Sequence, residues 1–385
     1  MTLLFNPAVR DLAAPPIPEV QGWARAYDGR HGPLLDFSQA VPGYPPHADL
    51  LAWLGEASAS AAYTGYGDIE GEAVLREAYA AHVSALYGSA VAASEIQITS
   101  GCNQAFFATM LALAAPGDEV ILVRPFYFNH EMTLDMLGIA VRAVDANATD
   151  GFVPSPDAVA ATIGERTRAV VLVSPNNPTG AVYPEPVLQA IFEICRARGV
   201  WLIVDETYRD FLADSDSAPH RLFANPGWQD GFIQLYSFSK SFCIPGHRLG
   251  AIAAGTAAVD QTVKIMDNLQ ICAPRPAQHA LARAIPALAA WRSANRAEMA
   301  RRADAFRSAL ASSRWHIEAL GAYFGYVRHP FADGSAAAVA ERLASEFGMI
   351  TLPGSYFGSG QEPFLRLAFA NADAATIALL ATRLP

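Results

Sequence analysis

The sequence is poor in charged residues, and those it has are mostly acidic. Charged residues make up 17% of the 385, and 37 Asp and Glu against 27 Lys and Arg give a formal net charge of -10. Binding to the phosphate backbone of a nucleic acid needs a basic surface, so this balance argues against a nucleic-acid partner. We expect the ligands of this protein to be small molecules.

Long apolar runs are missing as well. No stretch is long enough to cross a bilayer, and the opening residues, MTLLFNPAVRDLAAPP, lack the basic and apolar blocks of a signal peptide. We therefore expect a cytoplasmic protein that does not bind membranes.

Patterns typical of disulfides, metal sites and dinucleotide sites are also absent from the sequence. The cysteines are scattered without a CxxC pair, and no cluster of His and carboxylates has the spacing of metal ligands. We expect four buried free thiols and no metal. A GxGxxG fingerprint is lacking too, which weakens an assignment as an oxidoreductase that uses a dinucleotide. The four cysteines are Cys102, Cys195, Cys243 and Cys272.

Apolar residues, by contrast, are plentiful. They make up 52% of the chain, enough to bury a substantial core, and 385 residues exceed the usual size of a single core. The sequence thus predicts one large domain and one smaller domain. We place an N-terminal arm with part of the small domain at 1–46, the large domain at 47–275 and the small C-terminal domain at 276–385.

Short apolar bursts alternate with helical stretches through the middle of the chain. The bursts are rich in branched residues, which is typical of buried strands in a mainly parallel sheet. Between them, residues 104–115 and 184–199 have the spacing of helices, and this alternation predicts an α/β fold. The expected strands are EVILV (119–123), RAVVLV (168–173), VWLIVD (200–205), FIQLYS (232–237) and LGAIAA (249–254).

Polar side chains follow three of these strands, where open α/β sheets bind ligands. Asp205 and Tyr208 come at the end of VWLIVD, and the amide-rich SPNNPTG (174–180) follows RAVVLV. After FIQLY comes SFSKSFCIPGHRLG (237–250), in which Lys240 stands in a largely uncharged loop. Lysine is seldom buried without a task, so an amine at this place favours a chemical role.

These motifs resemble those of the fold type I, pyridoxal-phosphate-dependent class I and II aminotransferases. The resemblance runs from SQAVPGYPP (38–46) to FLRLAFA (364–370), with the motifs in family order and close to family spacing. It implies a large domain with a mainly parallel sheet flanked by helices, a smaller α+β domain, and pyridoxal 5'-phosphate (PLP) as the cofactor. The implied activity transfers an amino group from an L-amino acid to a 2-oxo acid by a ping-pong mechanism.

The resemblance also implies roles for the residues around the cofactor ring. Lys240 would form the Schiff base with the pyridoxal aldehyde and move the substrate proton. Asp205 would keep the pyridine nitrogen protonated, which makes the ring an electron sink. Asn177 and Tyr208 would hydrogen-bond the phenolic oxygen, and Tyr127 would stack on the ring.

The cofactor phosphate has its own set of implied ligands. They are Ser237, Arg248 and the backbone amides of Gly101 and Cys102, where a helix is expected to begin, with help from Asn103.

Other implied positions concern the substrate and the assembly. Tyr66 matches a tyrosine that reaches the phosphate of the neighbouring subunit, which implies a homodimer with shared active sites. Arg366 matches the arginine that clamps the substrate α-carboxylate. Ala40 stands near the substrate where many relatives have glycine, so its methyl group could narrow the pocket. Arg275 is a weaker candidate for a second arginine that binds dicarboxylates from the partner subunit.

Several alternatives stay open at this stage. Taken singly, Asp205 could cap a helix, Asn177 could be a turn residue, and Arg366 could form a surface ion pair. The same motifs would also serve a β-lyase or cyclising enzyme of this fold. A non-catalytic, aminotransferase-like ligand sensor is the alternative from another class, although such proteins usually carry a DNA-binding segment ahead of the domain.

Overall fold

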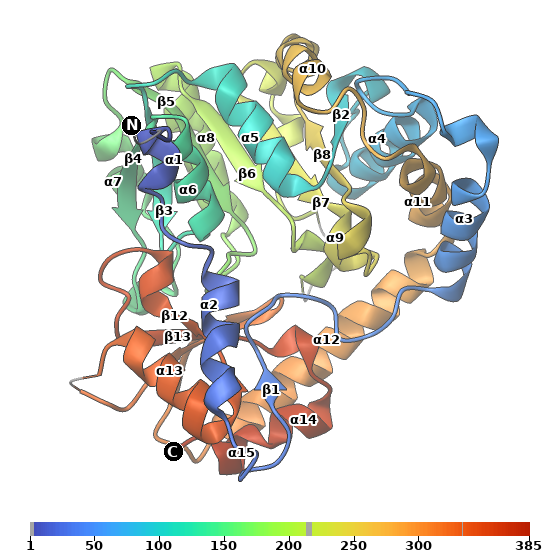
Figure 1. Cartoon of the computed structure of the whole chain (residues 1–385). Coiled ribbons are helices and arrows are strands. Elements are labelled where there is room, and N and C mark those ends of the chain that lie inside the picture. The colour runs from blue at the N-terminus through green and yellow to red at the C-terminus, as the bar shows by residue number, and fades with distance from the viewer. Residues whose placement is uncertain (1–3, 213–217, 333) are drawn as a thin grey trace.

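A central seven-stranded sheet forms the core of the larger part of the molecule (Figure 1). The computed structural model describes residues 4–212, 218–332 and 334–385. The strand order is β2-β8-β7-β6-β5-β3-β4; β8 runs antiparallel to its neighbours β2 and β7, and the other pairings are parallel. The strands are β2 (Ile96–Thr99), β3 (Glu119–Arg124), β4 (Ala140–Asp145), β5 (Thr167–Val173), β6 (Trp201–Asp205), β7 (Phe232–Ser237) and β8 (Gly250–Ala253).

Helices cover the faces of this sheet and complete the predicted α/β architecture. All five expected strands are confirmed, while β2 and β4 were not predicted. The helix expected at 184–199 is α8, which ends at Gly199 in a left-handed conformation after two arginines in its last turn. The helices are α3 (Ala48–Ser58), α4 (Ala73–Tyr87), α5 (Cys102–Leu113), α6 (Phe128–Met136), α7 (Pro156–Thr162), α8 (Glu185–Arg198), α9 (Phe238–Ser241), α10 (Thr256–Leu269) and α11 (Arg275–Ala287).

A smaller four-stranded antiparallel sheet, β12-β13-β10-β9, lies below the large one in Figure 1. The long helix α12 (Ala289–Leu310) connects the two parts. The other elements here are β9 (His316–Gly321), β10 (Phe324–Arg328), α13 (Ala336–Phe347), β11 (Met349–Ile350), β12 (Leu352–Pro353), β13 (Phe364–Ala368), α14 (Ala374–Ala378) and α15 (Leu380–Arg383).

The N-terminal segment joins the smaller part of the molecule. After the short helix α1 (Pro7–Arg10), helix α2 (Pro16–Trp23) packs on α13, and β1 (Leu35–Asp36) pairs with β11. Helix α11 packs on α3 and α4, which belong to the larger part of the molecule. The domain limits 1–46, 47–275 and 276–385 remain a proposal.

All four cysteines are free thiols, but the expectation that all are buried is wrong for Cys272. Cys272 is partly exposed, and its sulfur accepts a hydrogen bond from the backbone N–H of Gly67 at 3.4 Å. The remaining three thiols are buried. Among the described residues, no helix combines the length and the apolar character needed to span a bilayer.

Two glycines bring the loop after β5 against the β9–β10 hairpin. Gly180 has a φ of +75°, and a Cβ atom there would overlap the backbone of Gly321. The same holds in reverse, because a Cβ on Gly321 would overlap the carbonyl oxygen of Gly180. The backbones of the two segments therefore meet with no room for a side chain.

We expect Gly180→Ala to lower the free energy of unfolding by roughly 2 kcal/mol or more, because it adds both a strained φ and a steric clash. Urea unfolding of the purified protein measures this loss. Gly199→Ala is the matched control, since Gly199 also has a positive φ but nothing lies within 4 Å of its would-be Cβ. Equal losses in the two variants would show that the contact with Gly321 does not matter.

Candidate active site

A polar cavity of about 190 Å³ opens at the carboxyl ends of β5, β6 and β7. Parallel strands bring their ends to one edge of the sheet, so residues far apart in the sequence meet here. The cavity is lined by Cys102, Asn103, Tyr127, Val173, Asn177, Asp205, Thr207, Tyr208, Ser237, Ser239, Lys240, Pro245 and Arg248. Nine of the predicted site residues are in this lining.

Lys240 lies on the single-turn helix α9, which begins directly after β7. The side chain of Ser237 caps this turn by accepting the backbone N–H of Ser239 at 3.3 Å. The Lys240 amine donates to the carbonyl oxygen of Ala40 at 2.5 Å, so the N-terminal segment lies over it. Its depth in the protein, together with Arg366 and Arg248, lowers the pKa of Lys240 to about 8. The amine is therefore much closer to its neutral, nucleophilic form at neutral pH than an ordinary lysine.

Asp205 is the last residue of β6 and is 5% exposed. Its Oδ2 lies 3.5 Å from Nε2 of His130, and its Oδ1 accepts the backbone N–H of Thr207 at 2.9 Å. Burial alone would raise the pKa of Asp205, but the contacts with His130 and Thr207 outweigh it and leave the pKa lowered. The cavity thus contains a carboxylate that stays ionised although it is buried.

Arg366, on β13, faces the predicted site from the smaller sheet. It is 3% exposed, and its Nη1 donates to Oδ1 of Asn177 at 3.0 Å while its Nη2 donates to the carbonyl oxygen of Ser38. Burial lowers the pKa of Arg366 to about 10. Its buried Nε has no partner in the structure. A buried guanidinium with a donor to spare is suited to binding a carboxylate.

Two tyrosines complete this side of the cavity. Burial raises the pKa of Tyr127 to about 12 and raises that of Tyr208 further still, so both keep their protons near neutral pH. Tyr127 comes directly before α6 and accepts from Asn129 at 2.8 Å, and Tyr208 is 4% exposed.

The start of α5 borders the cavity from the other side. Gly101 precedes this helix with a φ of 85°, and a Cβ there would overlap the guanidinium of Arg248. Backbone N–H groups at the start of a twelve-residue helix are donors for an anion, and Arg248 adds a positive charge beside them. Asn103 and Arg248 lie at the exposed rim.

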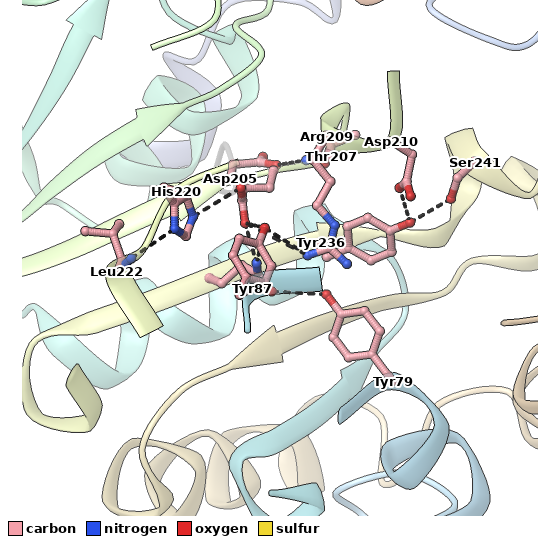
Figure 2. A network of polar contacts seen from close by, with 12 residues as sticks. Tyr79, Tyr87, Asp205, Thr207, Arg209, Asp210, His220, Leu222, Tyr236 and Ser241 are labelled. Atoms are coloured by element: carbon pink, nitrogen blue, oxygen red, sulfur yellow. Dashed lines mark hydrogen bonds and ion pairs between the residues drawn. The ribbon is translucent and has the colours of Figure 1, made fainter. Parts of the chain in front are cut away.

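A buried polar network lies behind the cavity and fixes the loop after β6 (Figure 2). Glu206 accepts from Tyr87 at 2.6 Å, and its Oε1 lies 3.2 Å from Nε2 of His220. Further along the loop, Asp210 accepts the hydroxyl of Tyr236 at 2.6 Å, and that hydroxyl also lies 2.6 Å from the Ser241 hydroxyl. These contacts join the loop that follows Asp205 to the turn that carries Lys240.

Some site residues were missed from the sequence, and two predicted ones lie apart. His130, Thr207 and Ser239 carry no distinctive spacing, although His130 follows Tyr127 by one helical turn. Tyr66 is outside the cavity and 79% exposed. Arg275 is also outside, where it pairs with a glutamate.

The comparisons with known proteins all point to one family. The family model for aminotransferase class I and II matches residues 32–384. The arginine–pyruvate transaminase AruH of Pseudomonas aeruginosa is 33% identical over 315 residues, which cover 79% of this chain and 77% of that protein. The aromatic aminotransferase ISS1 of Arabidopsis thaliana is 28% identical over 358 residues, covering 91% and 88%. A solved Thermus thermophilus aspartate aminotransferase double mutant has a TM-score of 0.91 at 25% identity, covering 99% of each chain.

Proposed function

This chain belongs to the class I and II aminotransferase family and is an aminotransferase, and we propose that it works by a ping-pong mechanism with PLP. The amino group passes from an L-amino acid to a 2-oxo acid. The observation that carries this proposal is the pairing of Lys240 and Asp205 in one cavity, one with a lowered amine pKa and the other a buried ionised carboxylate.

The donors and acceptors of the cavity fit PLP. The start of α5 with Ser237 and Arg248 would hold the phosphate, and Asp205 would hold the protonated ring nitrogen. Asn177 and Tyr208 would bond the phenolic oxygen. Lys240 supplies the amine that a cofactor aldehyde requires. Tyr127 would pack on the ring from the start of α6.

When bound, PLP supplies an electron-deficient ring that takes up the charge left as substrate Cα loses its proton. Arg366 and Asn177 would bind the substrate α-carboxylate and so orient Cα. The Lys240 amine would accept the Cα proton and return it at the next step, a role that its lowered pKa suits. Asp205 would keep its negative charge throughout, supported by His130 and Thr207.

A donor panel tests this function directly. Each L-amino acid is added alone to the holoenzyme, and the cofactor absorbance band is followed for conversion to the amine form. Addition of pyruvate or another 2-oxo acid should then restore the original band. Release of ammonia, without conversion of the cofactor, would favour a lyase instead. The named relatives act on aromatic, arginine and aspartate substrates, which leaves the donor of this enzyme open.

We also propose a homodimer in the cytoplasm. Tyr66 is too exposed to serve its own cavity, which supports a role at the phosphate of a partner subunit. The four free thiols are compatible with a reducing compartment.

Because the site would then exist only in the dimer, specific activity should fall as the protein is diluted through its dimer dissociation constant. Analytical ultracentrifugation and initial rates over the same concentration range measure the two curves. A fully active monomer would rule out the shared site.

Arg366→Ala should raise KM for amino acids by roughly 30-fold or more, because the substrate carboxylate would be buried without its partner. The absorbance of bound PLP should stay nearly unchanged, since Arg366 does not line the cofactor cavity. Steady-state kinetics and the spectrum of the same sample provide both measurements. Arg328→Ala, which removes a half-exposed arginine on the neighbouring strand, is the control. Unaltered KM values in Arg366→Ala would move the clamp elsewhere.

A further inference from the structure

The segment that presents Tyr66 is held in place by the beginning of α11. This segment, residues 61–72, starts with a turn at Ala61–Tyr63 and ends at Glu72, directly before α4. We call it the Tyr66 segment. The Glu72 side chain is only 12% exposed and lies between Arg275 and His279 of α11. Glu72 is thus the centre of a small, partly buried cluster.

All three guanidinium nitrogens of Arg275 contact this segment. Its Nε lies 2.6 Å from Oε1 of Glu72, and its Nη2 lies 3.4 Å from Oε2. The remaining nitrogen, Nη1, donates to the carbonyl oxygens of Ala62 at 3.2 Å and Gly65 at 3.1 Å. Every guanidinium nitrogen therefore has a partner in the Tyr66 segment, and one of those bonds ends at Gly65, directly before Tyr66.

Two neighbours on α11 reinforce Glu72. His279 Nε2 lies 2.8 Å from Oε2 of Glu72, and the His279 ring packs on Tyr63 with centroids 3.9 Å apart. The backbone N–H of Glu72 donates to Gln278 at 2.8 Å. Burial would raise the pKa of Glu72, but Arg275 and His279 outweigh it and lower the pKa. Glu72 thus stays ionised, and breaking its pair with Arg275 would leave a poorly solvated charge.

Among the described residues, neither the cavity lining nor the two N-terminal segments next to it offers a further Lys or Arg for a second carboxylate. The sequence has no Lys or Arg from residue 31 to residue 75, a range that includes both the 38–46 segment over Lys240 and the Tyr66 segment. The cations that line the cavity are Lys240 and Arg248. Under the proposed function, Arg366 binds the α-carboxylate. Asn103, at the rim, is neutral.

We propose that Arg275 positions the Tyr66 segment and does not bind substrate, so that this aminotransferase takes amino donors without a second carboxylate. The proposal rests on the proposed function, because it assumes that Tyr66 contacts the cofactor phosphate in the partner subunit. It names both a positioning residue and the class of donor.

The donor class is tested with pairs of nearly equal shape. A side-chain carboxylate that loses its water without gaining a cation binds poorly, so kcat/KM should be roughly tenfold or more lower for glutamate than for glutamine. Aspartate and asparagine should differ in the same direction. A wild-type preference for either acidic donor over its amide would overturn the proposal. If no amino acid of any kind converts the cofactor, the proposed function itself fails, which is a different result.

The positioning role is tested by cofactor binding to the cofactor-free dimer. Arg275→Ala should weaken PLP binding roughly tenfold, the effect of losing one hydrogen bond to a charged group. Tyr66→Phe should weaken it by a similar factor. Because Arg275 acts through Tyr66, the double variant should bind no more weakly than the weaker single variant. Fluorescence titration with PLP provides the dissociation constants.

Two further variants guard against a trivial loss of folding. Glu72→Gln removes the other half of the pair and should reproduce the Arg275→Ala result. Arg283→Ala is the matched control, because Arg283 is on the same helix and pairs at 3.0 Å with Glu56, away from the Tyr66 segment. It should bind PLP as wild type does. Additive losses in the Arg275→Ala and Tyr66→Phe double variant would overturn the positioning role. So would an Arg275→Ala enzyme with normal PLP affinity but a selective loss of activity toward acidic substrates.

Discussion

Lys240→Ala is expected to lower the rate of transamination by at least about 10³-fold, because it removes the group that moves the substrate proton. PLP should still bind through the phosphate and ring contacts, so the loss is in kcat and not in cofactor content. Single-turnover conversion of the cofactor band by an excess of donor measures the rate. The sequence has one other lysine, Lys264, which lies exposed on α10 and supplies the matched control. Lys264→Ala should be fully active.

Chemical labelling provides an independent measurement of the same residue. Borohydride reduction of the holoenzyme followed by peptide mapping should place the pyridoxyl group on the Lys240 peptide. With only two lysines in the chain, a label on Lys264, or none at all, would be unambiguous and would contradict the assignment.

The direction of the pKa shift of Lys240 can also be checked in the cofactor-free protein. The amine should react with amine-specific reagents with a midpoint near pH 8, its folded-state pKa. The unfolded chain binds this proton more tightly, with a pKa of 10.5, so Lys240 disfavours the folded state below about pH 8. That unfavourable contribution should disappear as the pH rises from 8 toward 10.5. Lys240→Met should remove this pH dependence from the unfolding free energy.

Asp205→Asn is expected to lower kcat by roughly 10² to 10³-fold while KM changes little, because the negative charge beside the ring nitrogen acts on the transition state more than on substrate binding. The shape of the side chain is kept, so its contact with Thr207 should survive. Stopped-flow measurement of the donor half-reaction isolates the affected step.

Asp210→Asn is the control for general damage to the same loop. Asp210 contacts Tyr236 in the network of Figure 2, pairs with Arg292 at 3.4 Å, and does not line the cavity. It should lose stability but keep kcat within a few-fold of wild type. A similar kcat for Asp205→Asn would disprove the electron-sink role of Asp205.

The parts of the fold that could be predicted are those whose pattern is local. Strands β5 and β7 are almost continuously buried, so their apolar runs stand out in the sequence. Strand β4 lies at the sheet edge and is largely exposed, with Arg142 in its middle, and β2 contains Gln97 and Thr99. Neither has the apolar run that predicts a buried strand, and both form because a neighbouring strand offers hydrogen bonds.

The site residues also fall into two groups, those that a local motif predicts and those that only tertiary packing brings together. Lys240, Asp205 and Asn177 stand in motifs of adjacent residues, and the structure brings them into one cavity as expected. The contact of Arg366 with Asn177 spans 189 positions, and that of Lys240 with the Ala40 carbonyl spans 200. His130 stands in no recognisable motif, and its role follows only from its contact with Asp205 in the folded protein. Such pairings depend on tertiary packing, which no local pattern encodes.

The strand order of the large sheet determines when each strand can pair during synthesis on the ribosome. Strand β2 is made before every other strand of its sheet, yet within the described part of the chain its one neighbour is β8, which begins at Gly250. Strand β1 pairs with Met349 and Ile350 of β11, which are made later still. A growing chain therefore carries β2 unpaired until β8 is made and β1 unpaired until β11 is made, and pairings of such long range close slowly. The N-terminal segment that covers Lys240 follows β1 directly, so the site should be the last region of this enzyme to become ordered.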